Sequence, residues 1–465
     1  MSLDFLKPAP YQPITKTPEE VRESYRYWRI RICYSIFLGY VAFYFTRKGF
    51  ASVMPFMMDD LGFTKAQLGI LSTILSITYG ISKLIGGIMS DKSNPRYFMA
   101  IGLIATGILN IFFAFASSIW VFALFWGLNG WFQAWGWPAC CKQLNYWFEQ
   151  KERGFWYSVC STSHNVGAAL LPILIVYVAV ATNWRFAMFA PAIISIVMGL
   201  VLINRLRDVP RSLGLPTVEE FKNQCQSNSC LPDENTQHDT KHISLGVREI
   251  LFKHVLNNKY IWIFALSYFF VYLVRTAIHD WTPLYLKEAK GIGIVTATWG
   301  VFFFEGGGLL GQLAAGWGSD YFWKGNRVPV MILCAIGLII SLFGLRYIPA
   351  NFMYLNMAML AMIGFFVYGP QMIVGLAAAE YVDKRAAASS NGFAGTIGYL
   401  GSAVAGYPLG KMLDVWGWHP YITVLFLSSA MIFILLLPLW SNNNGEKKMA
   451  KQKKSWIRRR QLEGA

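Results

Sequence analysis

The sequence predicts an all-α polytopic membrane protein of twelve transmembrane helices, arranged as two pseudo-symmetric six-helix bundles. Three observations carry this prediction. The 465 residues are 55% hydrophobic and only 14% charged, whereas a soluble domain has about 25% charged residues. Apolar segments of roughly 20 residues, the length that crosses a bilayer, recur along the chain. Polar landmarks of the first half also return in the second half at a nearly constant offset.

The apolar segments are separated by short polar stretches, except after the sixth, where a long polar stretch follows. Each segment is expected to be a helix, because a chain in lipid must satisfy its own backbone hydrogen bonds. The expected spans are 32–56, 66–90, 97–116, 119–141, 154–180, 184–204, 259–286, 295–319, 328–347, 352–379, 386–411 and 418–440. The predicted divisions are an N-terminal segment (1–31), a first half (32–204), a linker (205–258), a second half (259–440) and a basic tail (441–465).

The distribution of basic residues predicts the orientation. Lys and Arg exceed Asp and Glu by 16, a surplus that in a soluble protein would suggest nucleic acid. Here the cations gather before the first span, in alternate loops, in the linker and in the tail, which is the positive-inside pattern. We therefore expect a multi-pass protein of the cell inner membrane with both termini cytoplasmic, bound to the lipid bilayer and not to nucleic acid. The first 30 residues contain no apolar stretch typical of a cleavable signal peptide.

Four pairs of landmarks indicate an internal duplication. Arg47 and Arg275 lie 228 residues apart, and Asp91 and Asp320 lie 229 apart. Gly-Trp-Pro at 136–138 matches Tyr-Gly-Pro at 368–370, and Lys-Glu-Arg-Gly at 151–154 matches Asp-Lys-Arg-Ala at 383–386. The loops after the second and eighth spans are expected to act in gating through Asp91, Arg96, Asp320 and Arg327.

Two arginines within the predicted spans are the main candidates for a binding site. Tyr40, Tyr44 and Arg47 share one helical face, and Tyr268, Tyr272 and Arg275 repeat the same spacing. A planar guanidinium suits bidentate binding of phosphate, and a charge inside a membrane usually faces a water-filled cavity or a partner. The structural alternatives are that Arg47 snorkels to the membrane surface and that Arg275 pairs with Asp280.

Further polar residues in the spans are candidates for the lining of the same cavity. His164 is equally consistent with an interhelical hydrogen bond, Lys48 with a packing or snorkelling position, and the acids with simple balance of the nearby cations. The predicted cavity residues, besides the two arginines, are Tyr40, Tyr44, Lys48, Tyr79, Lys83, His164, Asn165, Tyr272, Asp280, Glu305, Tyr368 and Tyr399.

The sequence gives no support for an enzyme. It contains no nucleotide-binding loop, metal-ligand cluster or nucleophile elbow, so no catalytic residue, metal or cofactor is expected. Five of the seven cysteines fall in apolar spans, where they are small buried hydrophobes. Cys225 and Cys230 lie in the linker at a spacing that matches no metal site.

The duplicated loop, Gly-Ile-Met-Ser-Asp at 87–91 and Gly-Trp-Gly-Ser-Asp at 316–320, resembles the signature of the major facilitator superfamily. Within this superfamily, several motifs are similar to those of the organophosphate:phosphate antiporters. Over about residues 20–440, the chain resembles the subgroup of bacterial hexose-phosphate transporters and their related sensors. The motifs are Tyr-Phe-Thr-Arg-Lys, Tyr-Gly-Ile-Ser-Lys, Gly-Trp-Pro-Ala-Cys, Lys-Glu-Arg-Gly, Ser-His-Asn-Val-Gly and Val-Arg-Thr-Ala-Ile-His-Asp-Trp. The residues Ala-Cys-Cys at 139–141 depart from the Pro-Cys-Gly common in related members.

This resemblance implies a central cavity in which Arg47 and Arg275 hold phosphate, with Lys83, His164 and the tyrosines nearby. It implies alternating access by a monomer that exchanges a hexose phosphate, with glucose 6-phosphate as the first candidate, for inorganic phosphate. A second function stays open, namely a membrane receptor for external hexose phosphate that signals to a sensor histidine kinase. The binding residues do not separate the two, because a sensor needs them as well.

Overall fold

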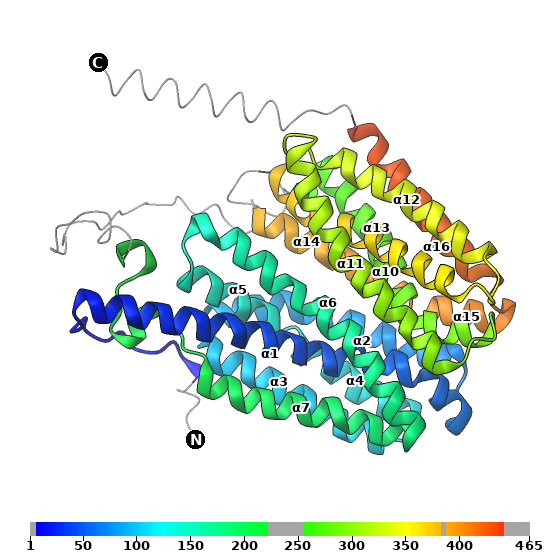
Figure 1. The fold of residues 1–465 in the computed structure, drawn as a ribbon, viewed down its shortest axis with the longest axis horizontal. Helices are drawn as coiled ribbons and strands as arrows, with labels where there is room; N and C mark the ends of the chain where they lie inside the picture. The colour runs from blue at the N-terminus through cyan, green and yellow to red at the C-terminus, as the bar shows by residue number, and fades with distance from the viewer. Residues whose placement is uncertain (1–5, 222–254, 383–386, 441–465) are drawn as a thin grey trace. The chain divides into compact units, whose positions relative to one another are not determined.

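The computed structural model describes residues 6–221, 255–382 and 387–440, and every regular element within them is a helix (Figure 1). Contacts between residues divide the chain into two compact units. Unit 1 comprises Met1–Phe63 and Ile74–Leu245, and unit 2 comprises Thr64–Thr73 and Gly246–Ala465. The first nine residues of the second helix, 65–73, thus group with unit 2.

Unit 1 is built on the helices of the first half. Helix α1 packs against α6 and α7, and α3 packs against α4 and α7 (Figure 1). The elements are α1 (Pro18–Leu61), α2 (Lys65–Asp91), α3 (Pro95–Phe115), α4 (Ile119–Gln133), α5 (Gly136–Trp147), α6 (Gln150–Ala181), α7 (Trp184–Arg205) and the 3₁₀ helix η2 (Pro210–Leu213).

Unit 2 is built on the helices of the second half. Helix α10 packs against α14 and α16, and α13 packs against α11 and α12. The elements are α10 (Lys259–Glu288), α11 (Ile294–Tyr321), α12 (Val328–Tyr347), α13 (Met353–Glu380), α14 (Ala387–Val404), α15 (Tyr407–Trp416), α16 (His419–Leu436) and the 3₁₀ helix η5 (Leu437–Leu439).

Two predicted spans are broken helices, and a proline lies just after each break. Pro138 has no N–H to donate to the carbonyl of Ala134, which is where α4 gives way to α5. Pro408 likewise cannot bond to Val404, the last residue of α14. A proline removes the hydrogen bond to the residue four positions earlier, and its ring clashes with that carbonyl. The two breaks lie in the fourth span of the first half and the fifth span of the second, so they are not equivalent positions of the duplication; Pro370, the counterpart of Pro138, lies inside the continuous helix α13.

The described helices confirm an all-α membrane protein. Each predicted span coincides with one helix or with one of the two broken pairs. Eight of the described helices are long and apolar enough to cross a membrane by length and composition. The other predicted spans coincide with α1, α2 and the two broken pairs, so the total of twelve stays a prediction. Helix α1 begins at Pro18, well before the predicted start of the first span.

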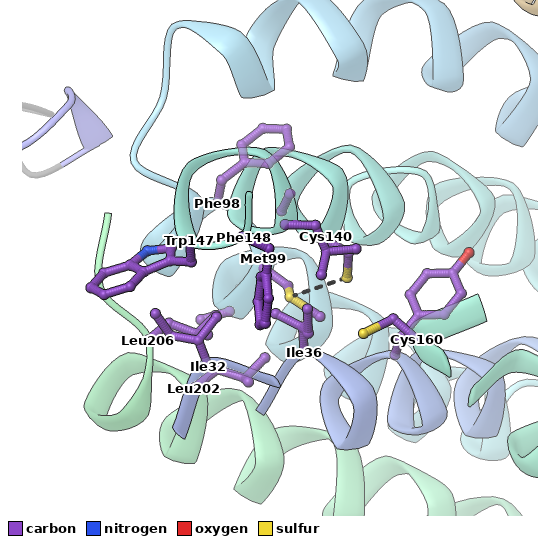
Figure 2. Packing of buried hydrophobic residues seen from close by; sticks show 14 of the residues in the cluster. Ile32, Ile36, Phe98, Met99, Cys140, Trp147, Phe148, Cys160, Leu202 and Leu206 are labelled. Atoms are coloured by element: carbon purple, nitrogen blue, oxygen red, sulfur yellow. Dashed lines mark hydrogen bonds between the residues drawn. The ribbon is translucent and has the colours of Figure 1, made fainter. Parts of the chain in front are cut away.

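The core of unit 1 lies where α1, α3, α5 and α7 meet (Figure 2). Ile36 on α1, Met99 on α3 and Leu202 on α7 are fully buried there. The sulfur of Met99 lies 4.0 Å from the sulfur of Cys140 on α5 (Figure 2). The cysteines within the described residues are free thiols, namely Cys33, Cys140, Cys141, Cys160 and Cys334. Cys225 and Cys230 lie outside the described residues.

In unit 2, glycines bring the backbones of α11 and α13 together. A Cβ atom placed on Gly307 would lie 1.9 Å from the carbonyl oxygen of Ala361, and one on Gly364 would lie 1.8 Å from the carbonyl oxygen of Phe304. Small residues permit this approach between membrane helices. The close packing fixes the distance between Glu305 on α11 and Tyr368 on α13, which both belong to the candidate site.

The first turn of α2 is held within unit 2 by Asp414 on α15. Its carboxylate accepts hydrogen bonds from the backbone N–H groups of Lys65 at 3.0 Å and Ala66 at 2.7 Å. An acid at a helix N-terminus satisfies orphan N–H groups and complements the helix dipole. Further along, the hydroxyl of Thr73 donates to the carbonyl of Ala403 at 2.7 Å. These contacts explain why the start of α2 groups with unit 2.

Candidate functional site

In unit 1, Arg47 lies among aromatic rings contributed by two helices. Its guanidinium carbon is 4.0 Å from the ring centroid of Tyr79 on α2 and 5.3 Å from that of Tyr44 on α1. The residue is only 8% exposed. An aromatic face attracts a cation without carrying a formal charge, so these rings hold the guanidinium in place and leave its positive charge intact.

The aromatic cluster extends from Arg47 to two more helices. The Tyr44 ring lies 5.6 Å from the ring of His164 on α6 and 5.6 Å from the ring of Tyr40. Tyr40 in turn lies 4.9 Å from the ring of Trp137 on α5. The structure therefore brings together four predicted residues of unit 1 around Arg47: Tyr40, Tyr44, Tyr79 and His164.

For three other candidates in unit 1, the structure gives the burial of the side chain. Asn165 is buried beside His164, whereas Lys48 and Lys83 are partly exposed. In His164, Nδ1 faces the carbonyl oxygen of Ser161 one turn earlier. Because a carbonyl oxygen only accepts, Nδ1 carries a proton in this arrangement.

A neutral polar network positions Arg47 and was missed from the sequence. The carbonyl oxygen of Thr46 accepts hydrogen bonds from Asn110 on α3 at 3.2 Å and from Asn129 on α4 at 2.8 Å. The hydroxyl of Thr46 bonds with that of Thr106 at 3.0 Å and accepts from Gln133 at 2.8 Å. Four hydrogen bonds thus fix α1 at the residue next to Arg47. The sequence feature that could have indicated this network is the presence of three amide side chains inside apolar spans, namely Asn110, Asn129 and Gln133.

In unit 2, Arg275 begins a chain of buried polar groups. Its Nε donates to the phenol oxygen of Tyr368 at 3.1 Å, and that phenol donates to Oε2 of Glu305 at 2.6 Å. Arg275 is 7% exposed and Glu305 is fully buried. The phenol oxygen of Tyr368 thus bonds to both the guanidinium of Arg275 and the carboxylate of Glu305, and it links the two charged groups.

The chain continues through His279, which sequence reasoning missed. Its Nε2 lies 3.6 Å from Oε1 of Glu305, and its Nδ1 lies 3.1 Å from Oδ1 of Asp280. The other oxygen of Asp280 accepts from the hydroxyl of Ser72, in the part of α2 that belongs to unit 2, at 3.0 Å. His279 follows Arg275 by four residues on the same helix, and this spacing was the signal that could have found it.

Tyrosines surround Arg275 as they surround Arg47. The Tyr272 ring lies 4.7 Å from the ring of Tyr268 and 5.1 Å from that of Tyr399 on α14. The guanidinium carbon of Arg275 is 4.7 Å from the centroid of the Tyr368 ring and 5.8 Å from that of the Tyr272 ring. The structure thus brings the predicted residues Tyr272, Asp280, Glu305, Tyr368 and Tyr399 together around Arg275.

The predicted gating arginines make different contacts in the two units. Arg327 pairs with Asp320 at 2.5 Å and with Glu380 at 3.6 Å. In unit 1, the Nε of Arg96 donates to the carbonyl oxygen of Ile203 on α7. The side chain of Asp91 lies outside the described residues.

The position of His279 between two acids makes it a structural requirement of this site. We expect His279→Leu to lower the free energy of unfolding by about 3–5 kcal/mol, the usual effect of removing one partner from a buried charged pair. His279→Gln retains one donor and should recover part of the loss. Thermal unfolding of the purified protein in detergent measures both. The control is His419→Leu, because His419 is exposed at the start of α16; equal melting temperatures for His279→Leu and His419→Leu would contradict the prediction.

Comparison with known proteins shows the family to which this chain belongs. The model of the Major Facilitator Superfamily matches residues 36–406. A probable hexose phosphate transport protein of Chlamydia trachomatis serovar D is 51% identical over 429 residues, which cover 91% of this chain and 93% of that relative. The membrane sensor protein UhpC of Escherichia coli (strain K12) is 43% identical over 94% of this chain and 98% of its own.

A solved structure supports the same fold. The crystal structure of the nucleoside transporter NupG has a TM-score of 0.64 and covers 88% of this chain and 98% of its own, at 15% sequence identity. At that identity the similarity concerns the fold alone. The chain belongs to the major facilitator superfamily, a family of membrane transporters and not of enzymes, and within it to the organophosphate:phosphate antiporter group.

Proposed function

We propose that this protein exchanges a hexose phosphate, with glucose 6-phosphate as the first candidate, for inorganic phosphate across the cell inner membrane. The observation that carries the proposal is the repeated buried arginine. Arg47 and Arg275 occupy equivalent positions of the duplicated halves, each with tyrosines three and seven residues earlier, and each is less than a tenth exposed. Buried charges inside a membrane protein are expensive and mark substrate pathways.

The chemistry of the two arginines fits a phosphate ester. A phosphate monoester carries about −1.5 to −2 charges at pH 7, a charge that the two positive charges of Arg47 and Arg275 match in magnitude. A tyrosine ring packs against Arg47, and the phenol of Tyr368 contacts both Arg275 and Glu305. The similarity to a probable hexose phosphate transport protein supports a sugar phosphate as the cargo.

Exchange follows from the same charges. In an alternating-access cycle, the bound anion would neutralise the arginines and lower the barrier to the change of state, whereas without an anion their like charges would oppose it. A carrier of this kind returns only when loaded, so inward movement of one anion requires outward movement of another. We propose that the protein works as a monomer with both termini in the cytoplasm, in line with its positive-inside loops.

The test is uptake of labelled glucose 6-phosphate into proteoliposomes that contain the purified protein. We expect rapid uptake into vesicles loaded with inorganic phosphate and none into vesicles loaded with sulfate at the same ionic strength. Equal uptake in both would overturn exchange. Unlabelled glycerol 3-phosphate, added outside as a competitor, measures whether the sugar contributes to recognition. A hexose-phosphate carrier should be inhibited far less by glycerol 3-phosphate than by unlabelled glucose 6-phosphate.

The second candidate function is a receptor for hexose phosphate that signals to a sensor histidine kinase. The observation that favours it is the 43% identity to a protein named as a membrane sensor. The two functions share ligand binding and differ in turnover. Binding of glucose 6-phosphate to the purified protein, measured by calorimetry, without uptake into phosphate-loaded vesicles would favour the receptor.

A further inference from the structure

Three arginines from separate parts of unit 1 converge on the C-terminal end of α7. Arg31 on α1 donates from Nη2 to the backbone carbonyl of Asn204 at 3.1 Å and to its side-chain oxygen at 3.0 Å. Arg207, just after α7, donates to the same backbone carbonyl at 2.9 Å. Arg96 on α3 donates to the neighbouring carbonyl of Ile203. Because the acceptors are adjacent carbonyls, the three guanidinium groups are close neighbours.

Capping of the helix explains only part of this arrangement. One cation near a helix C-terminus complements the dipole and the orphan carbonyls, but three like charges at one helix end repel one another. Partial burial lowers the pKa of Arg207, and the charges of Arg96 and Arg31 lower it further. Throughout the part of the chain that the structure describes, none of these three arginines pairs with an acidic side chain. The cluster therefore has a surplus of positive charge.

An aromatic ring organises the same cluster. The guanidinium carbons of Arg31 and Arg207 each lie 4.9 Å from the ring centroid of Trp28. Tyr27, one residue earlier on α1, is half exposed and accepts a hydrogen bond from Arg31. Tryptophan and tyrosine are enriched at the level of the lipid headgroups in membrane proteins. The cluster thus has the composition of a membrane interface.

Apolar stripes on two helices lead away from the arginines. On α1, Leu38 (48% exposed) lies on the same face as Arg31, about two turns further along, and Ile30 (61% exposed) lies beside that face. On α7, Val197 (55% exposed) and Leu200 (57% exposed) lie on the face that ends at Asn204. Helices α1 and α7 pack side by side (Figure 1). In a membrane protein these exposed stripes face the acyl chains of lipids.

We propose that Arg31, Arg96 and Arg207 bind the phosphodiester headgroup of an anionic phospholipid whose acyl chains lie along α1 and α7. The positive surplus matches the charge of the phosphodiester, and guanidinium groups bind phosphate oxygens with paired hydrogen bonds. The apolar stripes distinguish a lipid from a soluble phosphate, because a soluble anion would leave them without a role. Basic pockets between membrane helices bind headgroups in this way. The site is separate from Arg47 and Arg275 and does not rest on the choice of cargo.

The experiment measures lipid retention by the purified full-length protein in native mass spectrometry. Phosphatidylglycerol is compared with phosphatidylcholine of the same acyl chains. We expect the wild type to retain phosphatidylglycerol preferentially, and Arg31→Gln and Arg207→Gln each to weaken this binding roughly fivefold, since a basic residue near an anionic headgroup contributes about a factor of five. The matched control is Arg205→Gln, which removes the same charge two residues away from an exposed position at the end of α7.

Three results would overturn the proposal. The first is equal retention of phosphatidylglycerol by Arg207→Gln and Arg205→Gln. The second is displacement of the lipid by inorganic phosphate at equal concentration, which would assign the cluster to a soluble anion. The third applies even if the variants fail to fold. A photoactivatable phosphatidylglycerol added to the wild type should crosslink to residues 27–38 and 197–207, and crosslinks confined to other segments would exclude this site.

Discussion

Arg275→Ala is expected to abolish exchange of sugar phosphate while the protein still folds and inserts. The guanidinium is the charged group of unit 2 that we propose to bind phosphate, and Tyr368 and Glu305 hold its position. Removal of one partner from a buried hydrogen-bonded charge pair costs about 2–5 kcal/mol, roughly a 30-fold to several-thousand-fold loss of affinity. Binding of glucose 6-phosphate by calorimetry and uptake by phosphate-loaded proteoliposomes both measure the effect.

Two further variants make the result specific to Arg275. Arg275→Lys keeps the charge but loses the planar fork that binds two phosphate oxygens, so it should recover only part of the affinity. Arg346→Ala removes an exposed arginine from the last turn of α12 and should leave exchange unchanged. Wild-type affinity in Arg275→Ala would remove Arg275 from the proposed phosphate site, and normal binding with lost uptake would move its role from binding to the change of state.

Gly307→Ala is expected to unfold or severely destabilise unit 2. The added methyl carbon would lie 1.9 Å from the carbonyl oxygen of Ala361, a backbone atom that cannot turn aside. Overpacking of a membrane or protein interior usually costs 1–3 kcal/mol and sometimes more, and a clash this short belongs at or above the upper end of about 3 kcal/mol. Separation of α11 from α13 would also pull Tyr368 away from Glu305. Thermal unfolding in detergent and the amount of folded protein in the membrane measure the loss.

The neighbouring glycine supplies the control. A Cβ atom on Gly306 meets no atom within 4 Å, so Gly306→Ala adds the same methyl group one residue away without a clash. Alanine is favoured over glycine inside a helix by up to about 1 kcal/mol, so this variant should be neutral or slightly more stable. Similar melting temperatures for the two variants would show that the approach of α11 to α13 is not tight.

The amino-acid sequence was sufficient to predict the helices. In lipid every backbone polar group must be bonded within the helix, so hydropathy and length alone locate the spans, and all twelve predicted segments coincide with helices or broken pairs. The duplication of Arg47 and Arg275 was also visible in the sequence, because it is a repeat of residue types at one offset. The two breaks at Pro138 and Pro408 were not predicted, and a proline alone does not locate a break, because Pro370 lies inside the continuous helix α13.

The contacts within the candidate site were decided by tertiary structure. Tyr368 meets Arg275 across 93 positions of sequence and Glu305 across 63, and no local pattern gives the rotation of one helix against another. The close approach of α11 and α13 at Gly307 sets that geometry. Asp280, weighed from the sequence as a partner of Arg275, bonds to His279 and to Ser72 from another helix.

The same division holds for the arginines outside the candidate site. Sequence reasoning placed Arg96 in a gating loop by its motif, whereas the fold brings its side chain to the end of α7 beside Arg31 and Arg207. Hydropathy and charge along the chain determine which segments enter the membrane and which residue types repeat. Only the packing of helices distant in sequence determines which charges become neighbours, because those distances depend on side-chain volumes and backbone approach at every crossing.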